Sequence, residues 1–124
     1  IASKTGADAI IVSNHGGRQL DGAPSTIKVL PDIVDAVGNK MEVHIDGGIR
    51  TGQDVVKALC LGAKGTYIGR AFLYGLGALG KFGVFKTLDI IKNELDKTMA
   101  FCGRRDVKDL NRENIYKEKP YTNY

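Results

Sequence analysis

Three times along this chain, a short apolar segment is followed by a glycine-rich polar loop and then by a stretch with helical spacing. The apolar segments are residues 9–13, 42–46 and 65–68. Their short length and β-branched content favour strands, and the first is expected to be buried on both faces. Strands that alternate with helices predict parallel β/α units joined by right-handed crossovers. The sequence therefore predicts an α/β fold of about three such units.

The expected helices have recognisable ends. They span about residues 25–37, 52–61, 70–79 and 82–101, with a short helix at 106–110 and the tail of one at 1–8. Thr51 is placed to cap the second of them, and Gly38, Gly62 and Gly103 are placed to end helices. Pro31 is expected near a first turn, where proline is tolerated. In such folds, ligands bind at the carboxyl ends of the strands, where the three polar loops fall.

The composition is that of a globular chain without a membrane span or a nucleic-acid face. No apolar run approaches the roughly 18 residues that a membrane helix needs. The net charge is +4 with Lys and Arg dispersed, which disfavours nucleic acid and suits an acidic small molecule or a phosphate. Cys60 and Cys102 lie in apolar contexts without metal-ligand spacing, so we expect reduced core thiols in a cytoplasmic protein and no metal site. The chain starts at Ile1 without Met or a secretory leader, which predicts a piece of a longer polypeptide.

The loop after the first strand brings a titratable base and a fixed cation together. His15 and Arg18 lie three positions apart in Ser13-Asn14-His15-Gly16-Gly17-Arg18. An imidazole can exchange protons near neutral pH, and a guanidinium can hold a carboxylate at two points. The adjacent glycines let the backbone approach a ligand closely. Either side chain alone would be explained more simply by a tight turn, but the pair at a strand end predicts a site for an anionic organic substrate.

Two further loops, each after a strand and before a helix, predict a phosphate site. The first is Asp46-Gly47-Gly48-Ile49-Arg50, and the second is Gly69-Arg70. Small residues let successive N–H groups turn toward one point, and a helix N-terminus adds partial positive charge. Alone, each could be an ordinary turn with a solvated arginine. In consecutive units, they fit the phosphate site expected near the last two strands of a (β/α)8 barrel.

Together these motifs resemble the C-terminal part of the FMN-dependent 2-hydroxy-acid oxidases and dehydrogenases. This is the family of glycolate oxidase, L-lactate oxidase and dehydrogenase, and mandelate dehydrogenase. The resemblance covers residues 1 to about 116 and leaves residues 117–124 as a tail. It implies that the three units are strands 6 to 8 of a TIM barrel and that the cofactor is FMN.

The resemblance also implies roles for single residues. His15 matches the family's catalytic base, and Arg18 matches the arginine that binds the substrate carboxylate. The positions that match flavin or phosphate contacts are Ser13, Asp46, Gly47, Gly48, Ile49, Arg50, Gly69 and Arg70. The implied reaction is oxidation of an L-2-hydroxy acid such as lactate, glycolate or mandelate, by hydride transfer or through a carbanion. O2, a quinone or a cytochrome would accept the electrons, the full-length protein would be a homotetramer, and a dehydrogenase could be membrane-associated.

Other residues are expected to be structural. His44 is interpreted as a packed histidine, and Gln19 and Asp21 as residues that shape the substrate loop. The aromatic residues expected to pack in the interior are Tyr67, Phe72, Tyr74, Phe82 and Phe85.

Two alternatives stay open. Another phosphate-binding FMN or nucleotide barrel, such as the IMP dehydrogenase type, explains the Gly-Gly loop but not the pairing of His15 with Arg18. A barrel fragment that only binds a phosphate ligand would not be catalytic. A complete barrel takes roughly 250 residues. We therefore expect the 124-residue chain alone to expose strand edges and apolar surface, and to be inactive.

Overall fold

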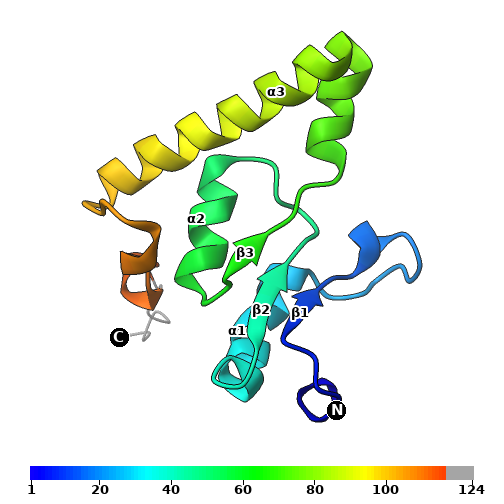
Figure 1. Cartoon of the computed structure of the whole chain (residues 1–124), viewed down its shortest axis with the longest axis vertical. Coiled ribbons are helices and arrows are strands. Elements are labelled where there is room, and N and C mark those ends of the chain that lie inside the picture. The colour runs from blue at the N-terminus through cyan, green and yellow to red at the C-terminus, as the bar shows by residue number, and fades with distance from the viewer. Residues whose placement is uncertain (117–124) are drawn as a thin grey trace, which may run out of the picture.

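In the computed structural model, which describes residues 1–116, three parallel strands form one sheet in the order β1–β2–β3 (Figure 1). They are β1 (Ala9–Val12), β2 (Glu42–Ile45) and β3 (Gly65–Thr66). β2 is the central strand and pairs with β1 through Val43 opposite Ile10, and with β3 through His44 opposite Gly65. The three predicted strands are confirmed, each one or two residues shorter than expected. The tail predicted for residues 117–124 lies outside the described residues.

The α-helices follow the predicted order, and short 3-10 turns at residues 15–17 and 112–114 were not predicted. They are α1 (Thr26–Val37), α2 (Gly52–Cys60) and α3 (Arg70–Phe101), with short 3-10 turns η1 (Ala2–Lys4), η2 (His15–Gly17), η3 (Val107–Asp109) and η4 (Arg112–Asn114). Non-helical backbone at Leu79 and Gly80 breaks α3 into the two helices that the sequence predicts, and Figure 1 shows the sharp bend. The expectation for Pro31 is wrong. The helix begins at Thr26, so Pro31 lies inside α1, where it removes one backbone N–H donor.

The hydrophobic core lies between the sheet and the helices that cross over it. Its most deeply buried side chains are Leu30 from α1 with Val43 and Ile45 from β2, all with at most 1% of their surface exposed. A second cluster joins α2 and α3 to the segment after α3 through Val56, Cys60, Met99 and Leu110. Burial raises the pKa of the Cys60 thiol, which fits the expected reduced core thiol.

Two burial expectations are wrong, and both errors have one cause. β1 is an edge strand in this chain, and Ile11 is 51% exposed rather than buried on both faces. Aromatic side chains expected in the interior are exposed, namely Tyr67, Tyr74, Phe82 and Phe85. None of residues 1–116 forms an element that covers these surfaces. The expected exposure of a strand edge and apolar surface is thereby confirmed.

An exposed ion pair links η4, near the end of the described residues, to α1. Arg112 of η4 donates to both carboxylate oxygens of Asp35 on α1, at 2.6 and 3.2 Å. These hydrogen bonds and the guanidinium charge lower the pKa of the Asp35 carboxyl. Within residues 1–116, no helix combines the length and apolar character needed to cross a bilayer.

Candidate functional site

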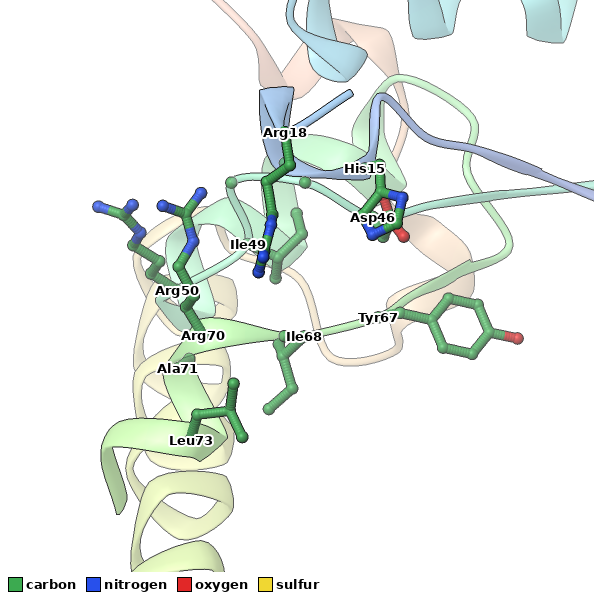
Figure 2. A pocket seen from close by; sticks show the side chains of 14 residues that line it. His15, Arg18, Asp46, Ile49, Arg50, Tyr67, Ile68, Arg70, Ala71 and Leu73 are labelled. Carbon is green, nitrogen blue, oxygen red and sulfur yellow. The ribbon is translucent and has the colours of Figure 1, made fainter. Parts of the chain in front are cut away.

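The three predicted loops meet at the carboxyl ends of the strands, around one cavity of about 340 Å³ (Figure 2). The residues that line it are His15, Gly16, Arg18, Asp46, Gly47, Gly48, Ile49, Arg50, Tyr67, Ile68, Gly69, Arg70, Ala71 and Leu73. In Figure 2, the guanidinium groups of Arg50 and Arg70 lie on one side, and His15 and Asp46 lie on the other. The cavity therefore has a strongly cationic side and a side that carries a titratable base.

His15 enters the cavity from a tight turn that local hydrogen bonds hold in place. Its φ of +54° lies in the left-handed region, which costs a non-glycine residue roughly 1–2 kcal/mol. The backbone N–H of His15 donates to Ser13 Oγ at 3.1 Å, and the N–H of Gly16 donates to Asn14 Oδ1 at 3.0 Å. Residues held in such strained conformations cluster at functional sites. The backbone of this turn therefore supports the prediction that His15 acts in the site.

Arg70 links the third loop to this turn. A Cβ built on Gly16 would lie 3.4 Å from Arg70 Nη2, so the guanidinium reaches the backbone beside His15. Among residues 1–116, Arg18, Arg50 and Arg70 have no ion-pair partner. Three cations without an ion-pair partner around one cavity favour an anionic ligand.

The structure changes the predicted source of the phosphate-binding amides. The N–H groups of Arg50 and Thr51 donate to Asp54 Oδ2, both at 3.1 Å, and Gly52 N–H donates to Glu94 Oε2 at 2.9 Å. Carboxylates of the protein itself therefore occupy the N-terminus of α2. The start of α3 differs, because its N-cap residue Gly69 has no side chain and, within residues 1–116, no side chain accepts a hydrogen bond from the N–H groups of its first turn. The anion site is therefore better placed at Gly48 and the first turn of α3 than at α2.

Two observations test whether the cavity fits a flavin nucleotide. Asp46 Oδ1 is buried and has no hydrogen-bond partner among the described residues, so it can accept a hydrogen bond from a hydroxyl of a ligand. Gly48 has a φ of +88°, and a Cβ built there would meet nothing within 4 Å, so its backbone faces open space. Together with Arg50 and Arg70, these groups offer an acceptor for a sugar-alcohol chain and donors for a phosphate. The residues present fit FMN.

Not every predicted residue lines this cavity. Ser13 lies in a neighbouring groove of about 600 Å³, which it shares with Gln19 and His15, while Asp21 lines neither space. His44 also lies outside, with Nε2 3.0 Å from Glu42 Oε2 and its ring tilted against Tyr67, as expected of a packed histidine. Sequence reasoning missed the apolar wall of Ile68, Ala71 and Leu73. Their spacing matches that of ordinary core residues and gives no signal of a site.

Comparisons with known proteins agree with this geometry. A protein-family model described as FMN-dependent dehydrogenase matches residues 1–117. The chain belongs to the FMN-dependent dehydrogenase family. It is 52% identical over 118 residues to an L-lactate dehydrogenase of Caulobacter vibrioides, and 51% identical over 116 residues to 2-hydroxyacid oxidase 1 of Mus musculus. These matches cover 95% and 94% of this chain, but the chain spans only 30% and 31% of those two relatives.

The fold comparison points to the same family. A soluble mutant of the membrane-associated (S)-mandelate dehydrogenase from Pseudomonas putida superposes with a TM-score of 0.87 at 47% identity. The match covers 91% of this chain and 32% of that structure. The three units of this chain are therefore part of a (β/α)8 barrel, as predicted. Because this relative is membrane-associated, the cytoplasmic location remains a prediction.

Proposed function

We propose that this chain forms part of an enzyme that oxidises an L-2-hydroxy acid, such as lactate, glycolate or mandelate, to the 2-oxo acid with FMN. The observation that carries the proposal is the meeting of His15, Arg18 and the two glycine-arginine loops around one cavity. A base, a carboxylate clamp and a phosphate site are the three groups that this reaction needs. We also propose that residues 1–124 belong to one barrel domain of a homotetramer, with O2, a quinone or a cytochrome as electron acceptor.

Arg18 would bind and orient the substrate. Its guanidinium has a planar fork that matches both oxygens of a carboxylate, which an ammonium group would hold only as a point charge. When the carboxylate is held in one place, the positions of the substrate hydroxyl and Cα relative to the imidazole of His15 are also fixed. Positioning of this kind lowers the activation barrier of the reaction. Arg18 therefore acts mainly on substrate binding.

His15 would remove a proton as the O–H and C–H bonds of the substrate break and the carbonyl forms. Histidine is the side chain that most often acts as a general base in enzymes. Bound FMN would supply the chemistry that the side chains lack, because it can take up the two electrons together with the second proton. Gly48, Arg50, Gly69 and Arg70 would hold its phosphate, and Asp46 would accept a hydrogen bond from its sugar-alcohol chain.

The test uses the holoenzyme, meaning the complete polypeptide that carries this sequence, loaded with FMN. The flavin absorbance should bleach when lactate, glycolate or mandelate is added without oxygen. His15→Ala should lower the rate of bleaching by about 10²-fold or more while FMN binding is kept. Arg18→Lys should mainly raise KM. His44→Gln is the matched control, because this histidine lies outside the cavity, and its rate should be unchanged.

Two results would contradict this proposal. Reduction of the flavin at the normal rate in His15→Ala would show that the base lies elsewhere. Turnover by an isolated chain of these 124 residues would show that the three units suffice for catalysis, against the expectation that they form an incomplete barrel.

A further inference from the structure

A buried hydroxyl lies behind the cavity without lining it. Thr26, the first residue of α1, is only 3% exposed. Its Oγ1 donates to the carbonyl oxygen of Asp46 at 2.6 Å and also lies 3.1 Å from the carbonyl oxygen of Gly47. A hydroxyl carries one proton, so the shorter bond to Asp46 dominates and the second is shared. Thr26 therefore links the start of α1 by hydrogen bonds to the backbone of residues 46–50, the loop that is proposed to hold FMN and is called the FMN loop below.

The same loop touches the turn that carries His15. A Cβ built on Gly47 would come within 3.1 Å of Asn14 Oδ1 and within 3.2 Å of Thr26 Oγ1. Asn14 Oδ1 itself accepts the N–H of Gly16, while Asn14 Nδ2 donates to the carbonyl of Pro24 at 3.3 Å. Thr26, Asn14 and Gly47 thus form a junction of three segments. We call this set the loop junction.

We propose that Thr26 is a positioning residue, which holds the FMN loop in its binding conformation and in register with the turn of His15. The inference rests on the proposed function, because it assigns a task to a residue behind that site. Thr26 does not line the cavity of about 340 Å³, although it lines the neighbouring groove with Ser13 and His15. Its hydroxyl bonds to the backbone of Asp46 and Gly47, and we infer that it acts on the site through this backbone.

The physical reason lies in the flexibility of the loop. Gly47 and Gly48 both have positive φ values, +80° and +88°, and glycine has more backbone freedom than any other residue. Without the Thr26 hydroxyl, two carbonyl oxygens lose their side-chain donor and the loop can sample further conformations. A ligand must then order the loop as it binds, and this cost appears as weaker affinity.

The experiment compares three variants of the complete polypeptide, prepared without flavin and titrated with FMN. Thr26→Val keeps the side-chain shape but removes the donor, and we expect the Kd for FMN to rise roughly 5- to 30-fold. Thr26→Ser keeps the hydroxyl and should stay within about 3-fold of the unaltered protein. Thr98→Val is the matched control, because it removes a hydroxyl that bonds only within its own helix, to the Glu94 carbonyl at 2.7 Å.

Hydrogen exchange of the flavin-free protein gives a second measurement that does not depend on activity. Amides of residues 46–50 should exchange faster in Thr26→Val and at the normal rate in the other two variants. Unchanged Kd and unchanged exchange in Thr26→Val would overturn the inference and leave the proposed function intact. A fall in thermal stability with unchanged Kd would also overturn it, because Thr26 would then be merely structural. Failure of the unaltered protein to bind FMN would instead reject the proposed function.

Discussion

Replacement of Gly52 by alanine should push α2 and α3 apart. Gly52 is the first residue of α2 and packs directly against the backbone of α3. A Cβ at this position would lie 2.0 Å from Leu95 N, 2.4 Å from the carbonyl carbon of Glu94 and 2.6 Å from the carbonyl oxygen of Ile91. All three are backbone atoms inside a helix, which cannot rotate away as the end of a flexible side chain could. One of the helices must therefore move.

The expected loss of stability has two parts. Inserting a methyl group into a well-packed interior costs about 1–3 kcal/mol, and a clash with backbone should lie at the upper end of that range. Movement of α2 also lengthens the bond from Gly52 N–H to the Glu94 carboxylate, now 2.9 Å. A hydrogen bond to a charged group contributes about 1.5–3 kcal/mol. We therefore expect Gly52→Ala to lower the free energy of unfolding by about 3–5 kcal/mol.

Urea unfolding of the complete polypeptide, followed by circular dichroism, measures this change. Gly77→Ala is the matched control, since the same methyl group on α3 would meet nothing within 4 Å. Because alanine favours a helix interior over glycine by about 1 kcal/mol, the control should be neutral or slightly stabilised. A Gly52→Ala protein as stable as the unaltered one would refute the reasoning, because the helices would then not be packed as closely as these distances require.

Two further predictions concern the core and the ion pair. Leu30→Ala should lower the free energy of unfolding by about 2–5 kcal/mol in the same urea assay, because Leu30 is fully buried and its removal leaves a cavity; a loss below 1 kcal/mol would contradict this. Arg112→Gln should lower the melting temperature at pH 7, because the Asp35 carboxyl has a lowered pKa in the folded protein. A group with a lowered pKa stabilises the fold above its unfolded pKa, about 3.9, and loses this effect as the pH falls through the folded value. The difference in melting temperature between the two proteins should therefore disappear below about pH 4. A difference that stays constant with pH would show that the Asp35–Arg112 ion pair does not cause it.

Local features of the sequence were enough to predict the order of the elements. Thr51 caps α2 as expected, because its hydroxyl accepts the N–H of Asp54 while the Asp54 carboxylate accepts the N–H of Thr51. The break between the two helices within α3 was also predicted, at a stretch with glycine. Such features depend on residues within about four positions of one another, so the sequence displays them directly.

Contacts between distant segments could not be predicted in this way. Thr26 lies 20 positions from Asp46, and Gly52 lies 42 positions from Glu94, so no local pattern connects them. A Pro-Ser-Thr run indicated only the start of a helix. The exposure of Tyr74, Phe82 and Phe85 was missed because apolar spacing predicts a buried side, but not whether the chain contains the surface that buries it.

By itself, the sequence determined that three β/α units would present a histidine and three arginines at the carboxyl ends of parallel strands. The alternation of strands and helices fixes this, since parallel strands must all end at the same edge of the sheet. Only the tertiary structure decided which backbone amides remain free to bind an anion. It also decided that the Thr26 hydroxyl donates a hydrogen bond to the loop after β2. Those outcomes depend on how closely α2 and α3 pack and on where α1 begins relative to β2, and packing is a property of the whole fold.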